Sequence, residues 1–276
     1  MSSSPRDLTT NKYIWGAGRS QNTRLKCALA NVDTLGLPGQ GDGADPNTRV
    51  SAQPGRIALF DNMFAKANFD FVGLNETKWK GSDLVIKDNY AFILPPTLGN
   101  QGVGIAVKLK IFYSLLAYHQ YSSRVMRVRF AGHGKHLSIV VAYAPTNTEA
   151  HSSEEREIFY KDLQKAYDEC GSQDVKLVIM DGNIETGNNP QVLPGLMGNY
   201  AHPSVNPNPL ESPNGEHFFP FCNNNDLCVG SSFFASHKKA KPYIKATFFA
   251  PNDNRAPVAL DHVLIDKGSL SCLTAV

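Results

Sequence analysis

Residues 69–79 read Phe-Asp-Phe-Val-Gly-Leu-Asn-Glu-Thr-Lys-Trp, an apolar run that passes directly into a carboxylate and an ammonium. The apolar residues of 71–74 predict a strand that is buried on both faces. Glu76 then stands where the chain leaves the core, and a carboxylate at such a rim is able to hold a hard cation. A single charged residue at a strand end is more often just the first solvated position. The function therefore depends on whether other strands end in the same way.

A second stretch, 176–183, has the same pattern and reads Lys-Leu-Val-Ile-Met-Asp-Gly-Asn. Its apolar residues run straight into acceptor groups. Asp181 and Asn183 are two residues apart, so their side chains share a face if the strand continues. Two buried strands that deliver oxygen ligands to one rim predict an active site rather than ordinary surface.

Two further strands place polar side chains at their ends. A short strand over 25–30 runs into Asn31, which also suits the start of an ordinary turn. The alternating segment 124–130 and the segment 137–143 are separated by a glycine-containing turn, which predicts a hairpin that ends in Tyr143. The arginines of this hairpin, Arg124, Arg127 and Arg129, are expected to be solvated rather than to bind a ligand.

Asp261 lies inside the apolar segment 259–265, which predicts another strand. A buried carboxylate needs a partner, and the rim of Glu76 and Asp181 offers a cation or an imidazole. We therefore include Asp261 in the candidate set. The complete set of candidate catalytic residues is Asn31, Glu76, Tyr143, Asp181, Asn183 and Asp261.

The segments between these strands predict helices and one long loop. Apolar residues at helical spacing predict a helix from Arg56 to Ala67 with Asn68 as its stop. Ser152 to Glu155 forms a capping signal for a helix that ends near Asp168. Residues 36–55 are rich in glycine and proline and predict a mobile loop near the end of the first strand.

The composition is that of one large α/β domain. The chain has 276 residues, of which 42% are hydrophobic and 19% are charged. We expect residues 1–23 to be a loose tail and residues 24–276 to form a single domain that acts as a monomer. A formal charge of +2 is compatible with a phosphate-bearing partner but far from that of a dedicated nucleic-acid binder.

The cysteines and the hydropathy indicate the compartment. The five cysteines form no Cys-x-x-Cys pair, which favours reduced thiols. The N-terminus lacks an apolar signal core, and no run approaches the roughly 18 apolar residues of a membrane span. We expect a protein of the nucleus or the cytosol, without membrane contact.

The order of these motifs resembles that of the endonuclease/exonuclease/phosphatase superfamily, the deoxyribonuclease-I-like enzymes. The resemblance covers residues 25–265, and its last strand-forming motif is Leu260-Asp261. Asn214-Gly215-Glu216 and Leu-Asn-Glu-Thr-Lys-Trp at 74–79 look most like retrotransposon-type endonucleases and relatives of craniofacial development proteins. The other matching pieces are Asn31-Val32, Val141-Ala142-Tyr143-Ala144-Pro145 and Asp181-Gly182-Asn183.

The resemblance implies an α/β fold in which a two-sheet sandwich is flanked by helices in four layers. It also implies that Glu76 and Asn31 hold Mg²⁺, with Mn²⁺ as a substitute. Asp181 and Asn183 are implied around the attacking water and the phosphate, and Tyr143 near the phosphate. These residue types suit phosphodiester hydrolysis, because the charge on the transition state has to be neutralised.

The chain departs from the family pattern at its C-terminal end. The family ends in a strand with a Ser-Asp-His motif, whereas no histidine follows His262 in this sequence. The resemblance therefore implies a fold that lacks the last strand and an impaired enzyme. An alternative is that Asp261-His262 is itself the terminal pair, although adjacent residues on one strand point to opposite faces.

The leading functional hypothesis is magnesium-dependent phosphodiester hydrolysis by an endonuclease that acts on nucleic acid, with DNA favoured over RNA. One alternative is a catalytically dead remnant that keeps the fold and at most binds nucleic acid. Another is a phosphatase of the same superfamily, since loops choose the substrate of such a site.

Overall fold

We describe the fold from a computed structural model, whose described residues are 25–33, 35, 55–97, 99, 101–148, 152–187, 194–202, 208–234, 247 and 257–273. The predicted tail, 1–23, lies outside these residues, and so does the predicted loop except for Gly55. Among the described residues, no helix is long and apolar enough to cross a membrane. The predicted division into tail and domain stays a prediction.

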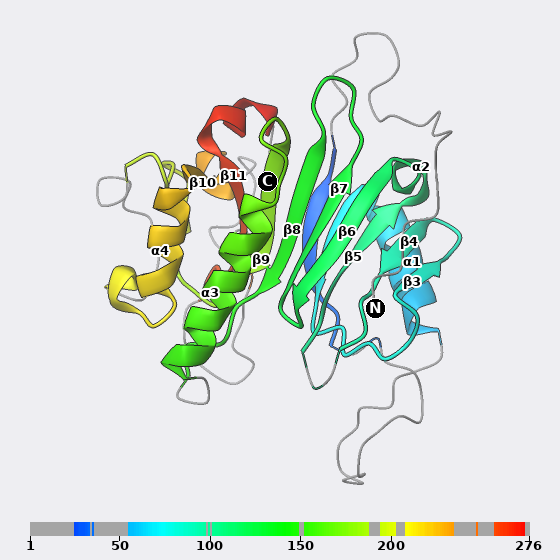
Figure 1. Ribbon diagram of the computed structural model, residues 1–276, viewed down its shortest axis with the longest axis horizontal. Coiled ribbons are helices and arrows are strands. Elements are labelled where there is room, and N and C mark those ends of the chain that lie inside the picture. Colours follow the sequence, from blue (N-terminus) through cyan, green and yellow to red (C-terminus); the bar gives the residue numbers. More distant parts are fainter. Residues whose placement is uncertain are drawn as a thin grey trace, which may run out of the picture.

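Two mixed β-sheets form the body of the molecule (Figure 1). The five-stranded sheet has the order β1 (Cys27–Asn31), β2 (Phe71–Asn75), β5 (Val103–Lys108), β4 (Tyr90–Ile93) and β3 (Leu84–Ile86). The six-stranded sheet has the order β10 (Leu227–Val229), β11 (Asp261–Asp266), β9 (Val175–Asp181), β8 (Leu137–Tyr143), β7 (Val125–Phe130) and β6 (Leu115–Ser122). The predicted hairpin is confirmed, because β7 and β8 pair antiparallel.

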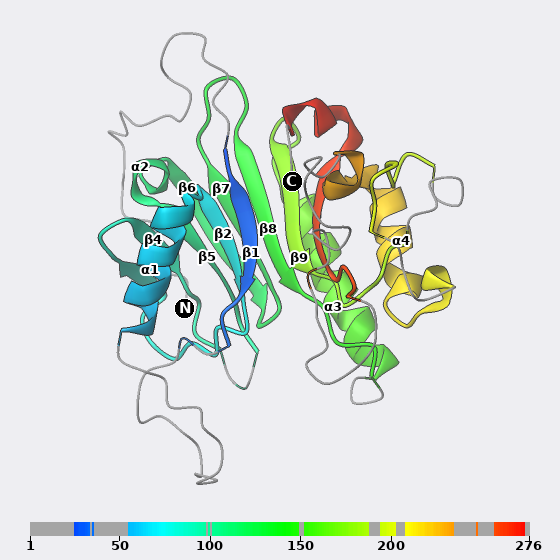
Figure 2. The same cartoon turned by 180° about the vertical axis from the view of Figure 1, so that it is seen from behind.

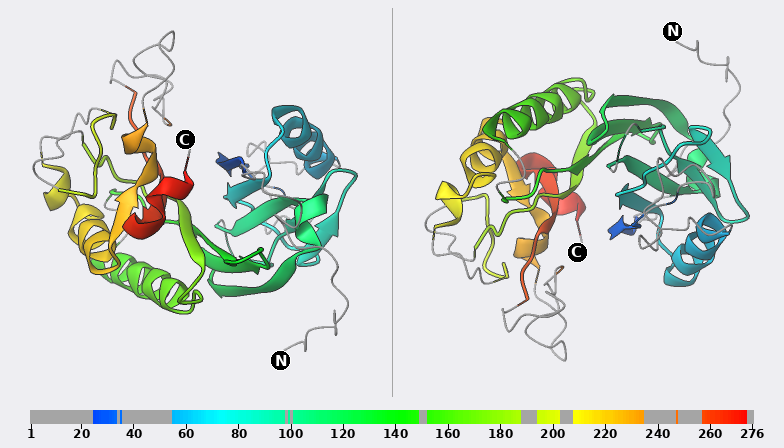
Figure 3. Two further views of the ribbon diagram at one scale, coloured as in Figure 1. Left: turned by 90° about the horizontal axis from the view of Figure 1, so that it is seen from above. Right: turned by 90° about the horizontal axis from the view of Figure 1, so that it is seen from below.

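Helices lie on the two outer sides of the sheets (Figure 3). Helix α1 (Arg56–Ala67) lies on one side, and helices α3 (Ser153–Asp168) and α4 (Gly215–Asn224) lie on the other. The predicted capping box at Ser152 and Glu155 is present at the start of α3, and Asn68 ends α1 in a left-handed conformation. The remaining helical turns are α2 (Leu109–Phe112), η1 (Pro209–Glu211), η2 (Gly230–Phe233) and η3 (Lys267–Cys272).

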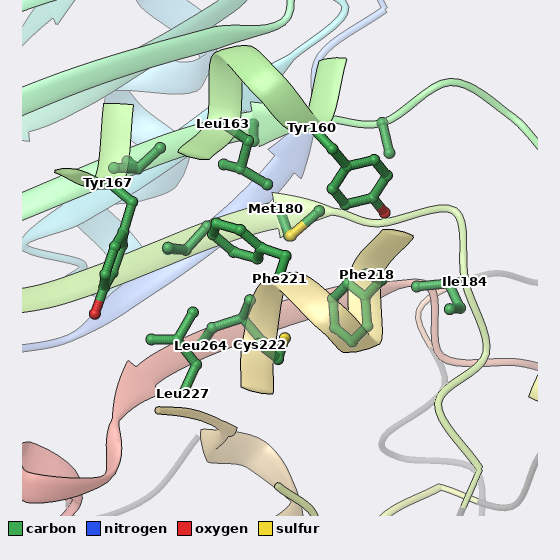
Figure 4. Packing of buried hydrophobic residues seen from close by; sticks show 14 of the residues in the cluster. Tyr160, Leu163, Tyr167, Met180, Ile184, Phe218, Phe221, Cys222, Leu227 and Leu264 are labelled. Atoms are coloured by element: carbon green, nitrogen blue, oxygen red, sulfur yellow. The ribbon is translucent and has the colours of Figure 1, made fainter. Parts of the chain in front are cut away.

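Three apolar cores separate these four layers. One packs α1 against the five-stranded sheet through Phe64 and Val72, and one fills the space between the sheets around Phe71. The third packs α3 and α4 on the six-stranded sheet and includes Leu163 and Phe218 (Figure 4). Because neighbouring residues of β2 belong to different cores, its sequence is apolar without alternation. The predicted two-sheet sandwich flanked by helices is confirmed.

The strand directions bring the polar strand ends to one edge. Strands β1 and β2 are parallel neighbours (Figure 2), and so are β8 and β9. Strand β11 runs antiparallel to β9, so its first residue, Asp261, faces the last residue of β9, Asp181. Strand β1 is the edge strand of its sheet in the described part of the chain. The predicted lack of a last strand stays a prediction.

Asp181 and Asn183 were predicted to share a face only if their strand continued to Asn183, and strand β9 ends before that. It stops at Asp181, and Asn183 has a left-handed backbone with φ 44°. The alternation of side chains therefore does not extend to Asn183, and a turn rather than a strand sets its orientation. The segments of β3, β4, β6 and β10 were not among the predicted strands.

Candidate active site

Glu76 accepts hydrogen bonds from two other strands. Its Oε1 accepts one from Asn31 Nδ2 at 2.5 Å and one from the Tyr143 hydroxyl at 3.2 Å. Asn31 ends β1 in the same sheet, whereas Tyr143 ends β8 in the other sheet. The carboxylate therefore bridges the two sheets at the edge where their strands end.

The backbone around Glu76 is held in sparsely populated conformations. Six described residues other than glycine have positive φ, and four of them, Asp33, Glu76, Lys78 and Asn183, belong to this edge. Such conformations cost on the order of 1–3 kcal/mol each and persist only where surrounding contacts enforce them. Here the loop before β5 supplies those contacts, because Gly102 O accepts the Thr77 N–H at 3.1 Å.

We expect Gly102→Ala to destabilise the protein more than Gly99→Ala does. Both glycines have positive φ, so both substitutions introduce backbone strain. A Cβ at Gly102 would also lie 2.3 Å from Thr77 Oγ1 and 3.1 Å from Lys78 N, whereas a Cβ at Gly99 meets nothing within 4 Å. Urea unfolding should show an extra loss of about 1–3 kcal/mol for Gly102→Ala. Equal losses would contradict a steric role for this loop under the site.

Two charged residues of the site were not predicted from the sequence. Lys78 Nζ lies 3.0 Å from Asp33 Oδ1 and 3.8 Å from Glu76 Oε2, so one ammonium is shared by two carboxylates. The Asp33 N–H also donates to Asn31 Oδ1 at 3.1 Å. Asp33 follows Asn31 by two residues, as Asn183 follows Asp181, and this repeated spacing was the available signal.

The six-stranded sheet contributes a row of three candidates. Tyr143, Asp181 and Asp261 are cross-strand neighbours on β8, β9 and β11, so their side chains share one face. The contact from Tyr143 to Glu76 joins this row to the other sheet. The structure thus brings together Asn31, Glu76, Tyr143, Asp181 and Asp261, which come from five strands. Their catalytic roles stay predictions.

All three residues of this row have raised pKa values. Burial, and next the charge of Asp261, raises the pKa of Asp181 to about 7. Burial also raises the pKa of Asp261, and the pKa of Tyr143 rises to about 12 through burial and the nearby Glu76 charge. Burial thus disfavours the charged form of both carboxyl groups, and raised pKa values of this kind are typical of functional sites.

Asn183 is fixed by a network of amides. Its N–H donates to Asp181 Oδ1 at 3.1 Å and its Nδ2 donates to Ala144 O at 2.9 Å. Its own carbonyl accepts from Asn147 Nδ2 at 2.8 Å and from Asn214 Nδ2 at 3.2 Å. Asn183 is therefore in contact with Asp181 through its backbone, and the fully buried Asn214 holds the loop from behind.

Arg124 lies closer to the site than expected. Its guanidinium donates to Tyr143 O at 3.2 Å and stands 5.1 Å from the centroid of the Tyr143 ring. Arg127 and Arg129 instead pair with Glu169 and Asp174 away from the candidate residues. The expectation that these arginines are solvated is wrong. Arg124 packs on the end of β8, and Arg127 and Arg129 are partly buried in ion pairs.

His262 points away from the site. It is 3% exposed, its Nε2 lies 2.8 Å from Ile184 O, and its ring packs on Phe218. Burial lowers the pKa of His262 to about 4. A neutral histidine on the helix side of the sheet cannot serve as the imidazole partner of Asp261, so the geometry contradicts the Asp261-His262 pair.

The donor set fits a hard divalent cation. Glu76 and Asp33 supply carboxylates, and Asn31 supplies an amide. Asn75 pairs with Asn31 in register, is 1% exposed, and has no hydrogen-bond partner for either amide atom among the described residues. Among the described residues, no three or more His, Cys, Asp or Glu side chains are placed so that they alone could hold a metal ion. A cation here would be held by one or two carboxylates and would keep several waters, as Mg²⁺ commonly does.

No family model matches the chain. It is 27% identical over 188 residues to craniofacial development protein 2 of Bos taurus, which covers 67% of this chain and 30% of that protein. The chain thus spans about a third of the curated relatives that it matches.

Solved structures match the fold over most of the chain. A 3′ phosphatase, NExo from Neisseria, bound to a product DNA hairpin has a TM-score of 0.55 at 14% identity, with 90% of this chain and 88% of that chain covered. An AP endonuclease from Archaeoglobus fulgidus has a TM-score of 0.58 at 12% identity, with coverages of 90% and 88%.

Proposed function

We propose that this chain, which has the fold of the endonuclease/exonuclease/phosphatase superfamily and is a distant homologue of craniofacial development protein 2, is a magnesium-dependent endonuclease that hydrolyses phosphodiester bonds of nucleic acid. The fold matches and the sequence relatives described above confirm the resemblance that the sequence motifs indicated, both to the superfamily and to craniofacial development protein 2. The activity itself is our proposal.

One observation carries this proposal. Five polar side chains from the ends of five strands lie at a single edge of the two sheets. Glu76 contacts Asn31 and Tyr143, and Asp181 and Asp261 follow Tyr143 in register across the second sheet. A carboxylate, a phenol and a pair of carboxylates with raised pKa are the groups that metal-assisted phosphodiester hydrolysis requires. A purely structural edge would gain nothing from strained backbone at Glu76 and Asn183.

The residues divide into two groups on this proposal. Glu76, Asn31 and Asp33 hold the cation, which when bound supplies Lewis-acid stabilisation of charge on the phosphate. Asp181 accepts a proton from the attacking water, and the Asn183 N–H holds the Asp181 carboxylate in place. The Tyr143 phenol, kept protonated by its raised pKa, has one O–H, which turns from Glu76 Oε1 to a phosphate oxygen when the substrate binds.

The substrate class rests on coarser support. Members of this superfamily typically use Mg²⁺, and one structural neighbour was solved with a DNA hairpin. We propose DNA rather than RNA as the substrate. A phosphatase activity on the same site is the second candidate, because that neighbour is itself a 3′ phosphatase.

The test is nicking of supercoiled plasmid by the 276-residue chain with Mg²⁺, with Mn²⁺ and with EDTA. We expect slow conversion to open circles with either metal, in keeping with the impaired activity that the sequence resemblance implies, and none with EDTA. Release of phosphate from a 3′-phosphorylated oligonucleotide without nicking would favour the phosphatase. Binding of DNA without either reaction would identify a remnant, and hydrolysis in EDTA would contradict the metal.

A further inference from the structure

Arg124 is held against Tyr143 by one backbone contact and two contacts of its side chain. The Tyr143 N–H donates to the Arg124 carbonyl at 2.9 Å, and the guanidinium donates to the Tyr143 carbonyl at 3.2 Å. The guanidinium also lies over the Tyr143 ring at 5.1 Å from its centroid. A cation stacked on an aromatic ring in this way has a defined plane, so its remaining N–H groups point in defined directions.

This guanidinium has no ion-pair partner in the part of the chain that the structure describes. Arg129 on the same hairpin donates to both carboxylate oxygens of Asp174, at 2.8 and 3.0 Å, and Arg127 lies 3.5 Å from Glu169. Burial lowers the pKa of Arg124, and the nearby Tyr143, Glu155 and Asp181 oppose that shift only in part. An unpaired, partly buried charge is costly unless a ligand of opposite sign completes it.

We propose that Arg124 binds a phosphate group of the nucleic-acid strand that enters the site. A guanidinium has five N–H donors in a planar fork that matches two phosphate oxygens, and the Tyr143 carbonyl occupies only one of them. Tyr143 links this arginine to Glu76, so the bound phosphate lies on the same edge as the residues proposed for hydrolysis. The inference rests on the proposed function, since it names a substrate contact of that site.

The contact predicts a change in salt dependence, which a merely structural role would not cause. Each phosphate contact contributes about 0.9 to the slope of log K against log salt for duplex DNA. We expect Arg124→Met to reduce that slope by about 0.9 and to weaken binding about 10-fold or more at low salt. Arg124→Lys should keep the slope, because it keeps the positive charge. It should bind DNA more weakly, because lysine lacks the planar set of N–H donors.

The control is Arg127→Met, which removes an arginine from the same hairpin whose charge is already balanced by Glu169. Binding of a short fluorescent DNA duplex is followed by anisotropy in EDTA over a range of NaCl, so that no hydrolysis interferes. Far-UV circular dichroism confirms that each variant is folded. If Arg124→Met does not fold, Arg124→Lys is compared with the wild type instead. A lower DNA affinity with an unchanged salt slope then supports the phosphate contact, and an unchanged affinity contradicts it.

The outcomes separate this inference from the proposed function. A reduced slope for Arg124→Met but not for Arg127→Met supports the phosphate contact, even if the chain never nicks DNA. Nicking by the wild type together with an unchanged slope and affinity in Arg124→Met overturns the contact and leaves the proposed function standing. A wild-type chain that neither binds nor nicks DNA overturns both.

Discussion

Replacing Glu76 with Gln is expected to lower plasmid nicking about 10³-fold while the protein stays folded. Oε1 of Glu76 accepts from Asn31 and Tyr143, and its other oxygen lies near the Lys78 ammonium. Glutamine keeps one acceptor oxygen, so its NH₂ group has to face either the Asn31 and Tyr143 donors or the Lys78 ammonium. It also removes the negative charge that would hold the cation. The loss should appear both in the rate and in the Mg²⁺ concentration needed for half of the maximal rate.

A second readout separates loss of the metal from loss of activity for other reasons. Titration with Mn²⁺, followed by its paramagnetic effect on water relaxation, should show binding to the wild type and weaker binding to Glu76→Gln. Glu169→Gln is the matched control, because Glu169 pairs with Tyr121 and Arg127 on the other side of the sheet. Full activity of Glu76→Gln, or an equal loss in the control, would refute the assignment of Glu76.

The sequence alone predicted those features of the fold that depend on residues close together in the chain. The unbroken apolar run of β2 predicted burial on both faces, and the cores around Phe71 and Val72 show why. The capping signal at Ser152 is a contact between residues three apart, so it is readable from the chain alone. The ends of the strands therefore predicted that Asn31, Tyr143 and Asp181 would lie near Glu76, whereas their roles stay predictions.

Contacts between distant residues were not predictable in the same way. Arg124 was expected in solvent because its alternation with Arg127 and Arg129 gives no sign that its turn folds onto Tyr143. The Lys78 contact with Asp33 joins residues 45 positions apart, and left-handed backbone at both of them makes it possible. Antiparallel pairing of β11 is likewise what brings Asp261 to this edge at the start of its strand rather than at its end.

Replacing Asp181 with Asn is expected to abolish activity, by about 10²- to 10⁴-fold, and to stabilise the protein above neutral pH. In the folded protein, burial and the Asp261 charge raise the pKa of Asp181 to about 7, whereas the unfolded chain titrates near 3.8. The carboxylate therefore costs folding free energy wherever it is ionised, and asparagine removes that cost. Its amide oxygen is still able to accept the Asn183 N–H. Opposite signs for activity and stability are expected of a group kept for chemistry.

The stability gained by Asp181→Asn should increase with pH. A raised folded-state pKa makes wild-type stability fully present below about pH 4 and progressively lost as the pH rises toward 7. A shift of about three units corresponds to at most about 4 kcal/mol, so the stability gained by Asp181→Asn should grow by up to this amount between pH 4 and pH 8. Asp174→Asn is the control of opposite sign, because Arg129 and Ser138 hydrogen bonds lower the pKa of Asp174 below 3.8 despite its burial. That variant should be destabilised throughout the same range.

Urea unfolding at several pH values measures the stability of both variants. A pH-independent effect of Asp181→Asn would show that the pKa of Asp181 is not raised in the folded protein.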